Sequence, residues 1–183
     1  MTKITPSYAI VFNFIFMAVA VAGELFLLDQ PNDQDVRMVV FLVLILTALP
    51  SLIASSILHY RCWSSIPSEI ARTTPGLAVG LLFVPFFNFY WCFVSYQGLA
   101  EDCATTLRSK GSWAGLGITL GILSITSTTI LINIPLLIIP IEVASFIVWL
   151  IYTFAIVASC NEIVNTKSAI TSRGTEESLQ TAD

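Results

Sequence analysis

Long apolar runs separated by short polar loops dominate this chain. The runs cover residues 8–28, 38–58, 77–100, 113–132 and 134–160. Each is close to the roughly 20 residues that an α-helix, rising about 1.5 Å per residue, needs to cross about 30 Å of hydrocarbon. Because 56% of the 183 residues are hydrophobic and only 11% are charged, a soluble fold of this size could not bury so much apolar surface. We therefore predict an all-α integral membrane helix bundle.

The positions of the eight Lys and Arg residues indicate how many of these runs cross the membrane. If all five cross, the charges divide three to five, which says little about orientation. If residues 77–100 enter and leave on the same face, only Arg37 lies apart from the others, as the positive-inside rule favours for a cytoplasmic face. The others are Lys3, Arg61, Arg72, Arg108, Lys110, Lys167 and Arg173. We predict four transmembrane helices and a non-crossing third segment in the cell inner (plasma) membrane, with both termini cytoplasmic. Five transmembrane helices are the alternative.

The third apolar run contains residues that disfavour a simple spanning helix. Pro85 lacks a backbone donor and disfavours helical geometry at Val84, so the run is expected to break into a short arm and a longer one. The first arm, about 12 Å long if helical, is far too short to cross. Tyr90 and Trp91 are typical of the headgroup level. We expect a re-entrant or interfacial segment, with a proline-kinked spanning helix as the alternative.

The same segment resembles a known group of proteins. From Phe83 the chain reads Phe-Val-Pro-Phe-Phe-Asn-Phe-Tyr-Trp, and Gly-Leu-Ala-Glu-Asp follows from Gly98 to Asp102. This resembles small, uncharacterised bacterial multi-pass membrane proteins that share a domain of unknown function and a Phe-x-Pro-Phe-Phe-Asn-x-Tyr-Trp motif. Outside this stretch only the order of the helices is similar, and Ala104 stands where the group's pattern has Asn. The resemblance implies an architecture and no reaction. Its candidate functional residues are Pro85, Phe86, Phe87, Asn88, Tyr90, Trp91 and Asp102.

Small residues form a stripe along the fourth apolar run. Gly117, Gly121, Ser124 and Thr128 follow the spacing that places side chains on one helix face. Such a face lets a neighbouring backbone approach closely. We interpret these as helix-packing residues, which contact either another helix of the same bundle or a second copy of the protein.

Residues suited to catalysis or metal binding are sparse. His59 is the single histidine, and it could share a metal site with Cys62, Cys103 or Cys160, but there is no Cys-x-x-Cys pair. No nucleophile elbow, phosphate loop or zincin signature is present. We predict no metal, no cofactor and no enzymatic activity.

Two acidic residues, Glu24 and Glu142, lie toward the outer ends of their apolar runs. At membrane depth such residues are candidates for a proton or cation site, whereas at the interface they would simply be solvated. The sequence leaves both interpretations open.

We predict a membrane bundle over residues 1–164 and a flexible polar cytoplasmic tail over residues 165–183. The net charge of -4 and the lack of a basic patch disfavour nucleic acid as a partner. The predicted function is that of a non-enzymatic accessory, scaffold or assembly subunit, which contacts membrane lipids and other membrane subunits or a second copy of itself. One alternative is a small transporter or channel component that uses the broken third segment. A weaker one is a lipid-active membrane enzyme using His59, Cys62 or Asp102.

Overall fold

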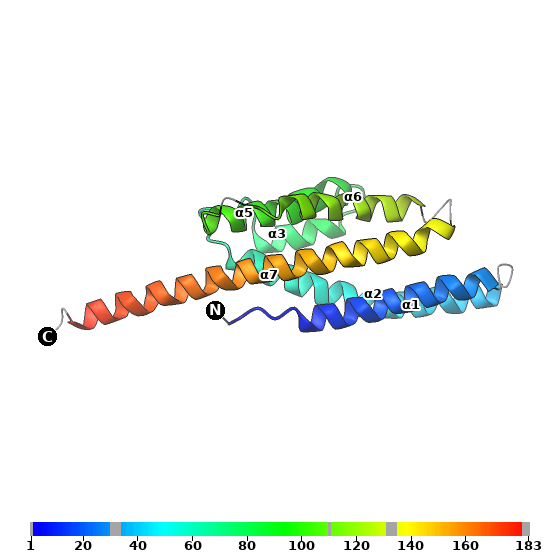
Figure 1. Ribbon diagram of the computed structural model, residues 1–183, viewed down its shortest axis with the longest axis horizontal. Helices are drawn as coiled ribbons and strands as arrows, with labels where there is room; N and C mark the ends of the chain where they lie inside the picture. Colours follow the sequence, from blue (N-terminus) through cyan, green and yellow to red (C-terminus); the bar gives the residue numbers. More distant parts are fainter. Residues whose placement is uncertain (1, 30–33, 110, 131–134, 181–183) are drawn as a thin grey trace.

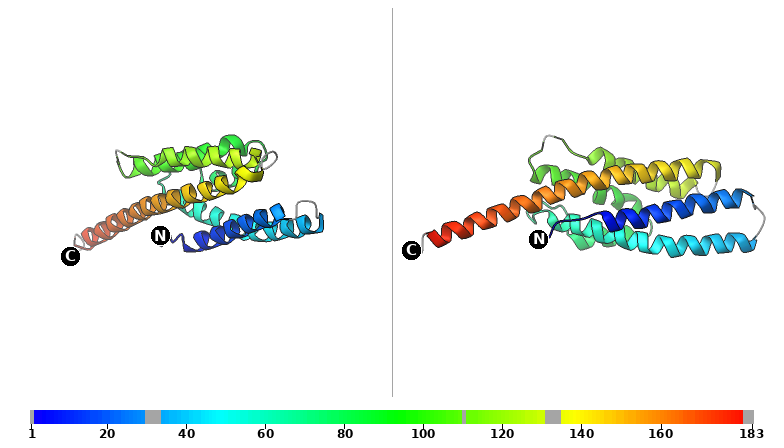
Figure 2. Two further views of the ribbon diagram at one scale, coloured as in Figure 1. Left: turned by 45° about the vertical axis from the view of Figure 1, so that its right-hand side comes forward. Right: turned by 60° about the horizontal axis from the view of Figure 1, so that its bottom comes forward.

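The computed structural model describes the backbone of residues 2–29, 34–109, 111–130 and 135–180, and the side chains of residues 2–27, 34–109, 111–123 and 139–173. All regular structure in these ranges is helical. Helices α1 (Ser7–Asp29) and α2 (Gln34–Ser65) form one antiparallel pair, and α6 (Ala114–Ile130) and α7 (Pro135–Gln180) form another (Figure 1). Helix α7 lies between α6 and the α1–α2 pair, as Figure 1 and the left view of Figure 2 show.

Three stretches in the described part of the chain are long and apolar enough to cross a membrane: Ser7–Leu27, Gln34–Ser65 and Ile139–Arg173. A shorter apolar helical stretch covers Ala114–Leu123 within α6. With 17 residues, α6 is about 26 Å long, near the thickness of the hydrocarbon core. The predicted all-α membrane helix bundle is therefore confirmed.

The third apolar run folds into a helical hairpin. Its outgoing arm consists of α3 (Pro75–Gly80) and the 3₁₀-helix η1 (Leu81–Phe83), and its returning arm of α4 (Asn88–Cys92), the π-helix η2 (Phe93–Gln97) and α5 (Gly98–Thr106). We call residues 74–106 the hairpin and residues 84–88 its tip. Helices α1 and α6 begin, and α2 stops, at the same end of the bundle. We call this the terminal end. The hairpin starts and finishes there (Figure 1).

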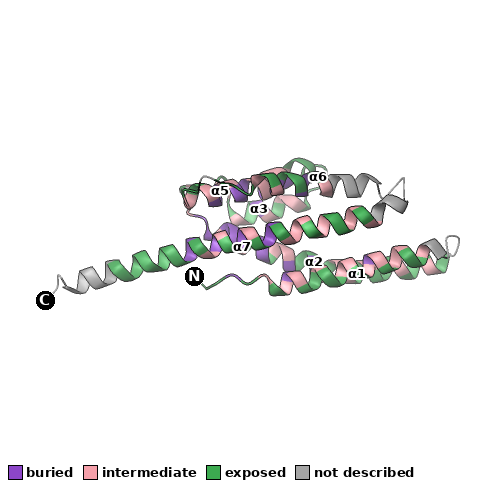
Figure 3. Cartoon of the chain, viewed as in Figure 1, coloured by how far each residue is buried: buried purple, intermediate pink, exposed green. Residues whose placement is uncertain are grey.

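The buried core is concentrated in the terminal half of the bundle (Figure 3). Trp63 on α2, Leu99 on α5 and Cys160 on α7 are almost completely buried there. Toward the other end, which we call the distal end, α2 exposes large apolar side chains such as Phe41 and Leu46. Such exposed apolar surface is what lipid tails would cover in a membrane.

The described N-terminal stretch and the described C-terminal part of α7 are placed differently relative to this core. The N-terminal stretch is held on α7, because Ile4 N–H donates to Asn161 Oδ1 (2.8 Å) and Asn161 Nδ2 donates to Ile4 O (2.9 Å). At the C-terminal end, α7 continues as a helix beyond residue 164, where the sequence predicts a flexible tail. Its residues 165–173 are all exposed, so this part of α7 extends past the core.

Candidate functional site

The hairpin contains every residue of the family-like motif, and its outgoing arm is shaped by its prolines. The Thr74 hydroxyl accepts a hydrogen bond from Leu77 N–H (3.3 Å), and Pro75 occupies the first turn, where a missing donor costs little. The arm ends before Pro85, because the proline disfavours helical geometry in the residue that precedes it. Val84 is accordingly extended, with φ −84° and ψ 115°. The break predicted at Pro85 is present.

A tight turn at Phe86 reverses the chain. Phe87 N–H donates to Pro85 O at 2.7 Å, and Phe86 has a positive φ of 62°. This left-handed region disfavours residues with a Cβ, and strained backbone of this kind is often found at functional positions. The Phe86 side chain is 87% exposed. The tip thus holds a large apolar side chain outward at a conformational cost.

The returning arm starts with an aromatic cluster. Phe87 stacks on Trp91, with ring centroids 5.5 Å apart, and meets Tyr90 edge-on at 5.9 Å. Asn88 N–H donates to Val84 O (3.0 Å). The Asn88 side chain is exposed, and it makes no hydrogen bond with any residue that the structure describes. Among the motif residues, Phe86 and Tyr90 are the most exposed aromatic side chains, at 87% and 62%, and Asn88 is an exposed amide beside them.

Buried polar contacts join the two arms of the hairpin. Ala78 O accepts hydrogen bonds from Trp91 Nε1 (3.2 Å) and from Ser95 Oγ (2.9 Å). Ser95 is completely buried, and its hydroxyl also lies 2.7 Å from His59 Nε2 on α2. Since an unpaired buried polar group is costly, these contacts fix both the spacing of the arms and their position against α2.

An ion-pair cluster closes the base of the hairpin. Arg72 contacts Asp102 through three hydrogen bonds, from its backbone N (3.0 Å), Nε (3.0 Å) and Nη2 (2.8 Å). Its Nη2 also lies 2.8 Å from Glu101 Oε2. The Asp102 side chain is only 5% exposed. Gly98 makes room for the cluster, because a Cβ there would lie 2.9 Å from Arg72 Cδ.

Hydrogen bonds also keep Glu101 charged. Gln97 Nε2 donates to Glu101 Oε1 (2.7 Å). This hydrogen bond, together with the hydrogen bond and charge of Arg72, lowers the pKa of Glu101 from its ordinary value. The base of the hairpin thus carries two carboxylates around one guanidinium.

Helix α6 packs closely on the returning arm through two glycines of the predicted stripe. A Cβ at Gly117 would lie 2.7 Å from Gln97 N, and one at Gly121 would lie 2.7 Å from the Phe93 ring. Both therefore contact η2 of the same chain. The side chains of Ser124 and Thr128, the other two stripe residues, lie outside the described residues. Helix α7 also contacts η2, because Tyr152 OH donates to Tyr96 O at 2.6 Å.

The structure brings together Cys62, Cys103 and Cys160, which were considered for metal binding. Cys103 and Cys160 have their Sγ atoms 3.7 Å apart, and Cys160 Sγ lies 3.7 Å from Cys62 O. No group of three or more His, Cys, Asp or Glu side chains in the described part of the chain is arranged to hold a metal ion. A small cavity of about 30 Å³ is lined by His59 and Cys62, whereas Asp102 is paired with Arg72 at the hairpin base.

The transporter alternative requires a polar path from Asn88 toward Ser124 or Thr128. The cavity described beside Asn88, of about 320 Å³, is lined by residues between Leu82 and Phe89 of the hairpin itself. Because the side chains of Ser124 and Thr128 are outside the described residues, this alternative stays a prediction.

Sequence reasoning singled out Asp102 but missed its partner Arg72, and it assigned no structural role to Ser95 or Gly98. The one available signal is Asp102 itself, since a carboxylate that follows an apolar stretch needs a cation if it is buried. In comparisons with known proteins, no family model, no curated protein and no solved structure matches the chain.

Proposed function

We propose that the protein is a non-enzymatic accessory or assembly subunit of a complex in the cell inner membrane, and that its hairpin is a re-entrant element that docks a transmembrane helix of another subunit. The observation that carries this proposal is the Asn88 side chain, which is exposed at the hairpin tip without a hydrogen-bond partner among the described residues. A tip that contacted only lipid tails would not need an amide.

The position of the tip in the membrane supports this interpretation. The outgoing arm has six α-helical and three 3₁₀ residues, so it is about 15 Å long, roughly half of the hydrocarbon thickness. Arg61, Arg72 and Arg108 flank the terminal end, which favours this end as the cytoplasmic face. If the base lies at that interface, Asn88 lies near the middle of the bilayer, and Tyr90 and Trp91 beside it lie deeper than the headgroup level that their residue types favour.

An amide in the middle of a bilayer favours a protein partner over lipid. Hydrocarbon offers no hydrogen bonds, so an unpaired amide there is costly. Side chains of this type hydrogen-bond between transmembrane helices and contribute about 1 kcal/mol. The exposed Phe86 ring beside Asn88 adds apolar contact area. The tip therefore fits a transmembrane helix that offers a polar side chain or an accessible backbone carbonyl.

Photocrosslinking from the tip tests this function. We expect a benzoylphenylalanine at position 86 to crosslink, in native membranes, to a transmembrane segment of another protein. The additional change Asn88→Leu should weaken the crosslink about fivefold, which corresponds to the loss of one interhelical hydrogen bond of about 1 kcal/mol. The protein's own melting temperature should not fall, because Asn88 makes no side-chain hydrogen bond within the described chain.

A probe at Phe41, which is exposed on α2 outside the hairpin, is the matched control and should not give the same product. Lipid adducts alone from position 86, or a crosslink unaffected by Asn88→Leu, would contradict the proposed docking.

A further inference from the structure

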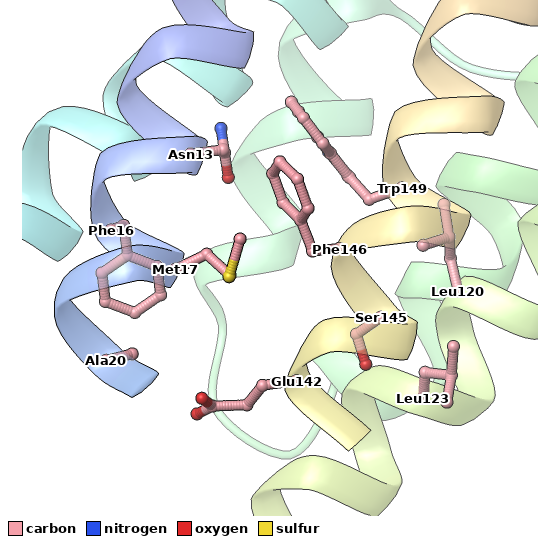
Figure 4. Close-up of a pocket in the computed structure, with 10 residues that line it drawn as sticks. All are labelled: Asn13, Phe16, Met17, Ala20, Leu120, Leu123, Glu142, Ser145, Phe146 and Trp149. Carbon is pink, nitrogen blue, oxygen red and sulfur yellow. The ribbon is translucent and has the colours of Figure 1, made fainter. Parts of the chain in front are cut away.

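Helices α1, α6 and α7 enclose a cavity of about 390 Å³ that the hairpin does not line (Figure 4). Its volume lies within the range of about 300–1,000 Å³ that is typical of small-molecule sites. The lining is mostly apolar and includes Phe16, Phe146 and Trp149. Glu142, Phe146 and Trp149 are only partly buried, so the cavity is accessible from outside the protein.

Glu142 is the chemically unusual residue of this cavity. Its side chain extends into the space between α1 and α7 (Figure 4), and its Oε2 atom is buried without a hydrogen-bond partner among the residues that the structure describes. The residue lies seven positions after the start of α7, about 10 Å into the helix. A carboxylate at this depth is costly unless a cation or a proton accompanies it.

The surroundings of Glu142 favour a positive group from outside. Glu24 on α1 is close enough to repel the Glu142 carboxylate. The other polar side chains of the cavity already have partners: Asn13 Nδ2 donates to Ala9 O and Ser55 Oγ, and Ser145 Oγ donates to Ile141 O. None of the described residues that line the cavity is a Lys, Arg or His.

The aromatic residues of the lining suit the same kind of ligand. Phe146 and Trp149 stack with ring centroids 6.0 Å apart, and both line the cavity together with Phe16. Aromatic faces attract cations, most strongly where water is excluded. A ligand with an apolar body and a diffuse positive charge would satisfy both the rings and the carboxylate.

We propose that this cavity binds an organic cation with an apolar body, its positive centre beside Glu142 and its body against Phe16, Phe146 and Trp149. Neither the hairpin nor its tip contributes to this site, so the proposal stands independently of the docking function. The cation is either a freely diffusing lipophilic cation or the ammonium headgroup of a membrane lipid.

Calorimetry on the full-length protein in dodecyl maltoside, with empty micelles as the blank, tests the proposal. The probe is tetraphenylphosphonium, and tetraphenylborate is the control of the same shape and opposite charge. We expect saturable binding of the cation and none of the anion. Glu142→Gln should weaken binding about tenfold or more, as expected for the loss of a desolvated charge contact.

Two further variants separate the site from general effects. Glu162→Gln removes the same charge from the same helix, about 30 Å away, and should leave binding unchanged. Ser145→Leu keeps both carboxylates but fills the cavity, so it should abolish binding. The melting temperature of each variant shows that it is folded.

The proposal is overturned if the folded wild-type protein does not bind the phosphonium, if Glu142→Gln binds it as tightly as wild type, or if the borate binds equally well. Adding phosphatidylethanolamine or phosphatidylglycerol to the micelles distinguishes a lipid ammonium headgroup from a freely diffusing cation as the natural occupant. If phosphatidylethanolamine competes with the phosphonium and phosphatidylglycerol does not, the occupant is a lipid ammonium group. If neither lipid competes, the occupant is a free cation. Both results support the site.

Discussion

Asp102→Asn is expected to open the base of the hairpin and to destabilise the folded protein by about 2–3 kcal/mol. Removing one partner of a buried ion pair costs about 3–5 kcal/mol, and a loss at or below the lower end of this range is expected here because the Arg72 side chain is 39% exposed. The side-chain amide of this variant also places an N–H donor where the native carboxylate accepts three hydrogen bonds from Arg72. Equilibrium unfolding in mixed micelles, followed by tryptophan fluorescence, measures the change.

Glu101→Gln is the matched control for this experiment. It changes the neighbouring carboxylate, which contacts the same Arg72 nitrogen but is 35% exposed. Exposed ion pairs of this type contribute about 0–1 kcal/mol, so the loss of stability should be much smaller than for Asp102→Asn. Equal losses at the two positions would show that Asp102 does not hold the hairpin closed.

Gly117→Ala is expected to be the most disruptive single-methyl change on α6. The added Cβ would lie 2.7 Å from Gln97 N, 2.8 Å from Gln97 Cα and 2.9 Å from Tyr96 C. All three atoms belong to the backbone of η2, which cannot rotate away as a side chain can. Overpacking typically costs about 1–3 kcal/mol, and we expect the upper part of this range. Unfolding curves in the same micelles provide the measurement.

Two other glycines of α6 complete a graded series. A Cβ at Gly115 meets nothing within 4 Å, so Gly115→Ala should stabilise the helix by up to about 1 kcal/mol through helix propensity. At Gly121 the clash is with the Phe93 ring, which can shift, so Gly121→Ala should be intermediate. A destabilisation at Gly115 as large as that at Gly117 would contradict the close packing of α6 on the hairpin.

The membrane class and the long helices could be predicted because apolar runs of about 20 residues have few other interpretations. The break at Pro85 could also be predicted, since proline restricts Val84 through local sterics. The positive φ of Phe86 could not. Nothing in Phe-Phe-Asn distinguishes a left-handed residue, which usually is Gly or Asn, and only the fold around the turn imposes it.

The contacts that hold the hairpin in place depend on tertiary structure and were not predictable from spacing. Arg72 and Asp102 are separated by 30 residues, and the sequence used Arg72 only as a charge on one side of the membrane. His59, considered as a metal ligand, instead contacts Ser95. A single sequence shows that a polar residue is present but not which partner the fold provides.

The most direct test of the proposal that the hairpin is re-entrant is the accessibility of single cysteines in sealed, right-side-out membrane vesicles. The four native thiols are all buried, so the wild-type protein serves as the unlabelled control. Cysteines are introduced at Thr74, Ser112 and Gln34, which are all exposed, and are treated with a membrane-impermeant maleimide. We predict that Gln34→Cys reacts in intact vesicles and that Thr74→Cys and Ser112→Cys react only after permeabilisation. Labelling of Thr74 and Ser112 from opposite sides would mean that residues 77–100 cross the membrane and would contradict the account.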